Sequence, residues 1–273
     1  MRRMIRSLAV VFPRGGFTPA YDPFAASIVH AYEPARRVLS TYTGNLVRLR
    51  RASDNAEADF GYLGNGDLDV AAIAAWAGGA SYVVTVYDQK GGDNVTMAVA
   101  ANQPLYVAAA QNGHAGMTLD GTNDYLQGAY TTGGALSQPV SMYAIAKTDT
   151  VVSGRYILDG DDAANRMALL FQADNTIAIF AGGIVSGAGQ DTNFHVFAML
   201  FSGAASALWQ DGAAFAAGDA GLQNADGITV GARNNASTWL SGDITSVIVA
   251  DPSHSDAQRA AMEIAMNTYW GVF

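Results

Sequence analysis

The segment FHVFAMLFSGAASALWQDG, residues Phe194 to Gly212, shows the pattern that decides the fold. It contains two short apolar runs, 194–201 and 206–210, and it ends on Asp211-Gly212, a pair typical of hairpin turns. From residue 115 onward the same rhythm continues, with short apolar runs separated by Gly, Asp and Asn. The other predicted strands are 116–119, 125–128, 140–147, 156–159, 167–172, 176–180, 228–231 and 242–250. So many closely spaced strands predict an antiparallel β-sandwich.

A mixed α/β region precedes these strands. Between residues 24 and 40 apolar positions recur at helical spacing around Pro34, which predicts two short helices. Strands are predicted at 46–50 and 82–87, with a helix at 67–76 between them. Residues 1–23 combine arginines, glycines and prolines, a composition typical of an extended arm.

The chain closes on a predicted helix from Asp256 to Tyr269. Ser255 and Gln258 have the spacing of a capping box, in which each side chain bonds to the backbone of the other residue. We expect this helix to pack on the sandwich through four residues that share one face: Ala261, Ile264, Ala265 and Tyr269.

Composition argues against several classes of partner. The 273 residues carry a net charge of −9, and no stripe of Lys and Arg interleaves with aromatics, so nucleic acid is not expected to bind. No apolar run approaches the length of a membrane span, so membrane insertion is not expected either. The run Leu8–Phe12 is too short for a secretory signal and is interpreted as part of the arm. The chain has no cysteine, which excludes disulfides and thiolate metal sites.

Four motifs lie in the first 104 residues. They are Tyr42-Thr-Gly44, Arg50-Arg-Ala-Ser-Asp54-Asn-Ala-Glu57-Ala-Asp59-Phe-Gly61, Tyr87-Asp88-Gln89 and Ala101-Asn102-Gln103-Pro104. Together they resemble the start of the arabinofuranosidase B catalytic-domain family. Similar segments occur in many bacteriophage and prophage structural proteins.

A second group of motifs lies in the strand-rich half: Leu119-Asp-Gly-Thr-Asn-Asp124-Tyr-Leu126, Leu208-Trp-Gln-Asp-Gly212, Val230-Gly-Ala-Arg233, Gly242-Asp-Ile244 and Ser255-Asp-Ala-Gln-Arg259. It resembles laminin-G and concanavalin A-like lectin or glucanase domains. The resemblance implies sugar ligands and a mainly β fold, a concanavalin A-like jelly roll over 106–273 with the C-terminal helix. Residues 24–105 would form an α/β preface packed on this sandwich, and residues 1–23 an attachment arm.

The catalytic positions that the first resemblance implies look vacant. In the family, a nucleophilic glutamate follows an aspartate-containing strand and two adjacent cysteines. Here the matching stretch, 156–165, has Ala163 or Ala164 at that position and no cysteine. The family's acid, an aspartate after a Gly-Gly strand end, aligns near Arg233. Glu33 and Glu263 are interpreted as solvated side chains, and Glu57 as a cap or a partner of Arg50 or Arg51, so no catalytic residue is predicted.

One acidic cluster, Asp159, Asp161 and Asp162, leaves hydrolysis open. Clustered carboxylates raise one another's pKa and can create an acid and base pair. Calcium could bind at 159–162 or at 120–124, but neither has regular ligand spacing, so turn chemistry is favoured and no cofactor is expected. The four histidines also lack metal-ligand spacing, and His195 is predicted to be a hydrogen-bonded core residue.

Sugar binding requires flat aromatic faces beside polar groups that hydrogen-bond hydroxyls. Trp239, in a predicted loop with Arg233, Asn234 and Asn235, is the best such grouping, although a packing role for Trp239 is an equal alternative. Asp161 and Asp162 complete the candidate glycan-binding residues. Trp76 and Trp209 are predicted to lie in the core.

The leading hypothesis is a virion surface protein of a phage or gene transfer agent, such as a spike, fibre or decoration subunit. It would be synthesised in the bacterial cytoplasm, attach to other virion proteins through its arm, form an oligomer in the particle and bind host surface polysaccharide without cleaving it. One alternative is a glycoside hydrolase or depolymerase related to arabinofuranosidases, with a relocated carboxylate pair. Another is a purely structural virion subunit without sugar affinity.

Overall fold

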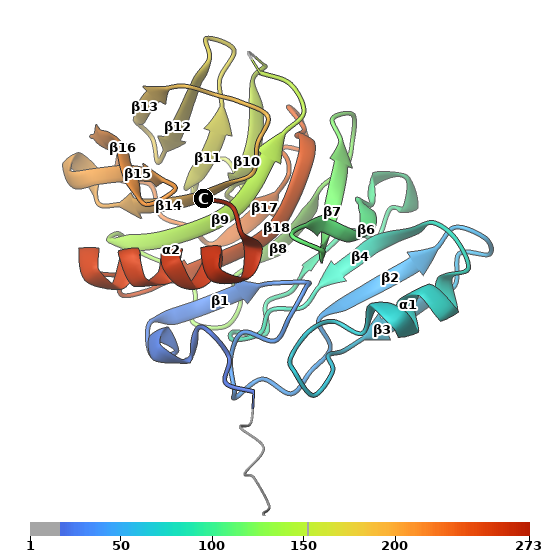
Figure 1. Cartoon of the computed structure of the whole chain (residues 1–273). Helices are drawn as coiled ribbons and strands as arrows, with labels where there is room; N and C mark the ends of the chain where they lie inside the picture. The colour runs from blue at the N-terminus through green and yellow to red at the C-terminus, as the bar shows by residue number, and fades with distance from the viewer. Residues whose placement is uncertain (1–16, 152) are drawn as a thin grey trace, which may run out of the picture.

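Antiparallel strands make up most of the computed structural model, which describes residues 17–151 and 153–273 (Figure 1). The strands are β1 (Ile28–Tyr32), β2 (Val47–Arg51), β3 (Glu57–Phe60), β4 (Ser81–Val86), β5 (Val95–Thr96), β6 (Leu105–Gln111), β7 (His114–Asp120), β8 (Leu126–Ala129), β9 (Val140–Thr148), β10 (Arg155–Asp159), β11 (Ala168–Phe171), β12 (Thr176–Phe180), β13 (Ile184–Ala188), β14 (His195–Phe201), β15 (Ser206–Gln210), β16 (Ala213–Gly218), β17 (Gly227–Val230) and β18 (Ser241–Ala250). The α-helices are α1 (Val70–Ala77) and α2 (Asp256–Trp270), and short 3₁₀ turns occupy Asp22–Phe24, Ala100–Asn102 and Gly203–Ala205. The mainly β fold expected from the sequence is confirmed.

One layer of strands is built around β18 and β9. These two strands pair along nearly their whole lengths, and β18 also pairs with β1. On its other side β9 pairs with β14, and the hairpins that follow add β15 and β16. Helix α2 packs on this layer beside β14 (Figure 1). The second layer runs in the order β13, β12, β11, β10, β17 and β8.

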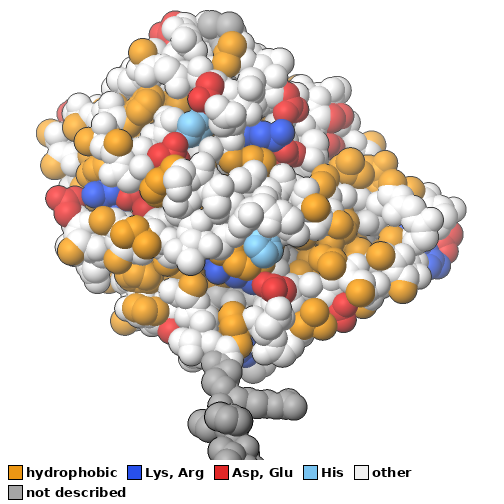
Figure 2. Space-filling model, viewed as in Figure 1, with side chains coloured by type: hydrophobic (Ala, Val, Ile, Leu, Met, Phe, Trp, Pro, Cys, Tyr) orange, Lys and Arg blue, Asp and Glu red, His pale blue; other side chains and the backbone are white. Residues whose placement is uncertain are grey.

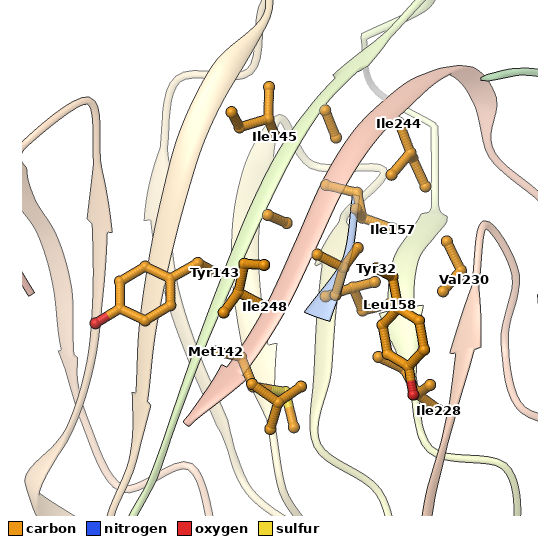
Figure 3. Packing of buried hydrophobic residues seen from close by; sticks show 14 of the residues in the cluster. Tyr32, Met142, Tyr143, Ile145, Ile157, Leu158, Ile228, Val230, Ile244 and Ile248 are labelled. Atoms are coloured by element: carbon orange, nitrogen blue, oxygen red, sulfur yellow. The ribbon is translucent and has the colours of Figure 1, made fainter. Parts of the chain in front are cut away.

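The core lies between the layers and is filled by aliphatic side chains. Figure 3 shows Ile244 from the first layer near Ile157 and Val230 from the second, and each of these three residues is at most 1% exposed. Because every central strand buries both of its faces, near-continuous apolar runs such as 140–146 replace strict alternation.

The strands of the N-terminal half extend both layers. Strand β4 pairs with β2, β5 and β6, β5 pairs with β8 of the second layer, and β7 pairs with β18 of the first. The sheet therefore continues from the strands of the preface into the sandwich without a break in its ladder.

The expectation of two short helices between residues 24 and 40 is wrong. Instead, Asp22–Phe24 forms a single 3₁₀ turn and Ile28–Tyr32 forms β1, with Tyr32 opposite Val247 of β18. The spacing of Ile28 and Tyr32 fits one face of a helix and also one face of a strand, and pairing with the buried strand β18 decides in favour of the strand. Of the proposed arm, residues 1–16 lie outside the described residues, whereas Tyr21 is fully buried in the core.

Side-chain or glycine caps mark both ends of α1 and the start of α2. The Asp69 side chain accepts a hydrogen bond from Ala72 N, and Gly78 ends α1 in the left-handed conformation. Ser255 and Gln258 form the predicted capping box of α2. The predicted packing face of α2 is half right: Ala265 and Tyr269 are partly buried against the core, whereas Ala261 and Ile264 are exposed. The residues that α2 buries are Met262, Glu263, Met266 and Trp270.

Two glutamates interpreted as solvated are buried. Glu33 is fully buried next to Arg36, and Glu263 is 1% exposed, with its carboxylate bonded to Arg259 and to Gly212 N. The expected partner of Glu57 is also wrong, because its carboxylate lies 4.0 Å from Arg48. Both cations lie close by in the sequence, Arg36 three residues after Glu33 and Arg259 four residues before Glu263, and only the Gly212 N–H comes from a distant part of the chain.

The described surface agrees with the composition in one respect. On the face shown in Figure 2, Lys and Arg side chains are few and separated, and they form no continuous basic stripe. Within the described residues, no helix is long and apolar enough to cross a bilayer.

Candidate functional site

Strand β10 ends at Asp159, whose carboxylate is buried and accepts hydrogen bonds on both of its oxygens. The Arg166 guanidinium binds both carboxylate oxygens of Asp159, with Nη2 to Oδ2 at 2.8 Å and Nε to Oδ1 at 2.9 Å. The backbone N–H groups of Gly160 and Asn234 donate to the same carboxylate. Asp159 is thus a structural anchor that holds the 160–167 loop against the loop after β17, and it has no free oxygen for chemistry.

Three other aspartates gather beside this anchor. One carboxylate oxygen from each of Asp161, Asp162 and Asp226 lies within 4.8 Å of the others. Asp226 directly precedes β17, and the Asp161 carboxyl lies over Gly227, where an added Cβ would be 2.2 Å from Asp161 Cγ. Only glycine permits this approach, so the backbone of β17 positions the cluster.

Hydrogen bonds give the three carboxyls different environments. Asp162 Oδ1 accepts the N–H groups of Ala164 and Asn165 at 2.7 and 2.8 Å, and the side-chain amide of Asn165 donates to Asp226 Oδ2 at 2.7 Å. Asp161 Oδ1 and Asp226 Oδ1 are buried and have no hydrogen-bond donor among the described residues. An oxygen of the Asp161 carboxyl lies within 4.8 Å of an oxygen of Asp226, so the two carboxyls interact directly.

The pKa values of two neighbouring aspartates diverge as a result. Burial, followed by the contact with Asp226, raises the pKa of Asp161 from 3.8 to about 6. The backbone N–H groups of Asn165 and Ala164 lower the pKa of Asp162, whose side chain is exposed. At pH 5, therefore, Asp161 is largely protonated while Asp162 is ionised, which is the pattern of an acid and base pair.

The loop after β17 brings other predicted residues to the same place. Gln127 of β8 donates to the backbone oxygens of Asp161 at 3.1 Å and of Asn234 at 3.4 Å, so it joins the two loops. Arg233 and Asn234 are half-buried and Asn235 is exposed. Trp239 is half-buried, and its indole Nε1 is buried without a partner among the described residues.

A hollow of about 720 Å³ opens next to the aspartates. Asn165 and Ala164 line one side of it, and the glycine-rich turns at Gly182-Gly183 and Gly221 line another. Ala163 and Ala164, one of which should hold the family's glutamate, are both exposed. The aspartates do not line this hollow themselves but adjoin it through Asn165, which bonds to Asp162 and Asp226.

The sequence pointed to only part of this cluster. Asp161, Asp162 and the 233–235 loop are close together, as their common assignment to a glycan site requires. Asp226 and Asn165 were missed, because the first lies more than 60 residues from the 159–162 cluster and the second is an ordinary loop residue. The Asp226-Gly227 pair before a strand was the only local signal, and it is indistinguishable from a turn.

The cluster has the donor set that a hard cation prefers, three carboxylates close together. At 120–124 the geometry is that of a turn, since Asp120 Oδ1 accepts the N–H groups of Thr122 and Asn123.

His195 is a hydrogen-bonded buried residue, as predicted, because its two ring nitrogens bond to Asp191 and Asp211. Trp76 and Trp209 are partly buried and pack against the core.

Comparison with known families identifies the chain. A family model described as the catalytic domain of alpha-L-arabinofuranosidase B matches residues 20–167, more than half of the sequence. The chain belongs to the arabinofuranosidase B catalytic-domain family. The first of the two resemblances in the sequence is thereby confirmed, whereas no comparison bears on a phage or gene transfer agent origin. Among curated protein sequences, none matches the chain.

Solved structures of arabinofuranosidases share this fold. One, complexed with arabinofuranosyl-alpha-1,2-xylobiose, superimposes with a TM-score of 0.75 at 16% identity, covering 93% of this chain and 65% of that one. A GH54 α-L-arabinofuranosidase soaked with a cyclic sulfate inhibitor gives 0.72 at 16% identity with the same coverage. Trypanosoma rangeli sialidase is more distant, with a TM-score of 0.52, 10% identity and coverage of 68% of this chain and 31% of that one. The chain thus spans about two thirds of the length of the arabinofuranosidases it resembles.

Proposed function

We propose that this family member is a glycoside hydrolase that acts on a furanose-containing glycan through Asp161 and Asp162. The observation that carries the proposal is the opposite protonation of these neighbouring carboxyls, one with a pKa near 6 and one with a lowered pKa. Their oxygens lie within 4.8 Å, which suits the separation of about 5 Å in retaining enzymes and is too short for inverting ones.

In this mechanism Asp161 is the general acid and Asp162 the nucleophile. Asp162 Oδ2, which is not used by the backbone, attacks the anomeric carbon while Asp161 gives its proton to the departing glycosidic oxygen. The resulting glycosyl ester is cleaved by water, which returns a proton to Asp161 and frees Asp162. Asp226 contacts the reacting Asp161 and keeps it protonated, so it is a positioning residue.

Substrate contacts are proposed for the surrounding loops. The hollow beside Asn165 is large enough for sugar units on one side of the cleaved bond. Arg233, Asn234, Asn235 and Trp239 would hydrogen-bond and stack on sugar from the other loop. Support for a furanose comes from family membership, since the matching structures are named as arabinofuranosidases.

The test compares two substrates across variants of the whole chain. The substrates are 4-nitrophenyl α-L-arabinofuranoside, whose phenolate leaves without protonation, and linear α-1,5-arabinan, whose sugar oxygen needs a proton. We expect Asp162→Asn to lose at least about 100-fold on both, and Asp161→Asn to lose about 100-fold on arabinan but much less on the aryl glycoside. Asp256→Asn, at a site whose side chain is 87% exposed, is the matched control. Equal rates for wild type and both variants would refute the proposal.

A second candidate is sugar binding without cleavage, as on the surface of a phage or gene transfer agent particle. Alanine at both 163 and 164 favours it, because the family's usual nucleophile has no direct counterpart. The contact between Asp161 and Asp226 favours it too, since carboxyls that face each other leave less room for a substrate bond. Retention on immobilised host polysaccharide or arabinan without release of reducing ends would support this candidate over hydrolysis.

A further inference from the structure

A second polar hollow, of about 590 Å³, lies where β2, β4, β6 and β7 meet, apart from the aspartate site. The residues that matter for its chemistry are Arg50, Tyr82, Gln103, Thr118, Asp120 and Asp124. Arg50 and Gln103 belong to the motifs through which the sequence resembles its family, but the proposed hydrolysis uses neither. Their role is therefore open.

Arg50 forms one wall of the hollow as a buried, rigidly held cation. It is 8% exposed, and it donates to Gln103 Oε1 at 2.6 Å, Asn55 Oδ1 at 2.8 Å and Ala100 O at 3.0 Å. All three acceptors are neutral, and within the described residues Arg50 makes no ion pair. Buried charges are normally compensated, so this wall offers an unusual cationic surface to a ligand.

The same hollow is also lined by two carboxylates, Asp120 and Asp124. Asp124 is 7% exposed, and among its hydrogen bonds is one from Asp120 N to its Oδ2 at 3.2 Å. Burial and then the nearby Asp120 raise the pKa of Asp124 to about 6. Tyr82 adds an aromatic ring to the lining, with the Arg50 guanidinium 4.7 Å from its ring centroid. Donors, acceptors and a ring face together are the groups that hold sugar hydroxyls and C–H faces.

Because side chains of both charges line the hollow, we expect a neutral ligand. An anionic sugar would approach Asp120 and Asp124, and a cationic one would approach Arg50. Hydroxyl groups can accept from the guanidinium and donate to the carboxylates at the same time. A pocket of this volume holds a small ligand such as one or two sugar units.

The hollow is also close to the aspartate site along the chain. Asp124 precedes Gln127 by three residues, which span at most about 11 Å, and Gln127 Nε2 lies 3.1 Å from Asp161 O. We propose that this hollow is a second, non-catalytic subsite that binds one or two neutral furanose units of the polymer processed at the aspartate site. The inference rests on the proposed function for the identity of that polymer.

The test separates a long ligand from a short one. Linear α-1,5-arabinohexaose is titrated calorimetrically into the whole chain carrying Asp162→Asn, alone and combined with Asp124→Asn or Tyr82→Ala. We expect each added substitution to weaken hexaose binding at least about tenfold, while Asp256→Asn leaves it unchanged. In the otherwise wild-type chain, Asp124→Asn and Tyr82→Ala should not change the rate on 4-nitrophenyl α-L-arabinofuranoside, which is too short to reach both sites.

Failure of this inference is distinguishable from failure of the proposed function. Hydrolysis of arabinan with hexaose affinity unaffected by Asp124→Asn and Tyr82→Ala overturns the second subsite alone. Hexaose binding that depends on both residues, in a protein that hydrolyses nothing, supports the subsite and overturns the hydrolase. Absence of hexaose binding to the parent variant overturns the subsite. Asp124→Asn is nearly isosteric, so it keeps the test valid should Tyr82→Ala fold poorly.

Discussion

Replacing Glu33 by glutamine should make the protein more stable at neutral and alkaline pH. Glu33 is fully buried, and neither carboxyl oxygen has a hydrogen-bond partner among the described residues. Its closest charged neighbour is Arg36, with Nε 3.9 Å from Glu33 Oε1. The polar side chains of Ser246 and Trp270 lie nearby, so the residue sits between β18 and the end of α2.

The expected magnitude follows from the pKa of Glu33. Burial outweighs the attraction of Arg36 and raises this pKa from 4.5 to about 7. A raised carboxyl pKa means that the folded state favours the protonated form of Glu33. The wild-type free energy of unfolding is therefore unaffected by this group below pH 4.5, and it decreases as the pH rises from 4.5 to about 7. Since a tenfold change in proton affinity is worth about 1.4 kcal/mol, the loss is about 3 kcal/mol. Glutamine remains neutral and avoids this loss.

Urea unfolding of wild type and Glu33→Gln between pH 4 and pH 8 measures the effect. The stability difference between the two proteins should change by about 3 kcal/mol in favour of the variant across this range. Glu57→Gln, the same chemical change at an exposed position, should show no such trend. A difference for Glu33→Gln that stays constant within about 1 kcal/mol would refute the claim that burial governs this carboxyl.

Three further predictions concern the aspartate site. Arg166→Met should cost about 3–5 kcal/mol in urea unfolding, because it leaves the buried Asp159 carboxylate without its cation. Gly227→Ala should reduce arabinan hydrolysis at least about tenfold, since its Cβ would displace the Asp161 carboxyl, at a stability cost of about 1–3 kcal/mol. Hydrolysis of arabinan should decline as the pH rises above about 6, because Asp161 must be protonated to act, and Asp226→Asn should move this decline to lower pH.

Each of these has a result that contradicts it. Combining Arg166→Met with Asp159→Asn should recover part of the lost stability, and no recovery would mean that charge is not the cause. Full activity of Gly227→Ala would show that the position of Asp161 is unimportant. If the decline in arabinan hydrolysis occurs at the same pH in Asp226→Asn as in wild type, a group other than Asp161 controls it.

Local signals in the sequence determined most of the strands and the start of α2. Runs such as 140–147 and 242–250 became β9 and β18, because apolar stretches between turn residues can bury both faces only within a sheet. Asp211-Gly212 forms the predicted hairpin turn between β15 and β16, with both residues at positive φ. The alanines at 163 and 164 were also visible without a structure.

Strands without a strong local pattern were not recognisable. The alanine- and glycine-rich β13 and β16 have few β-branched or aromatic residues, and each is held by the strand it pairs with. Strand β1 resembled a helix until its pairing with β18 was known.

The tertiary structure alone decided how charged groups are distributed between the surface, the core and the site. Folding buries Glu33 between β18 and the end of α2 without a hydrogen-bond partner among the described residues, and it brings Gly212 N to the buried Glu263 carboxylate from 51 positions away. Asp226 meets Asp161 because β17 pairs with β10, which brings together residues that are more than 60 positions apart. Propensity and periodicity act over a few residues, whereas a carboxyl's pKa depends on every group that folding places around it.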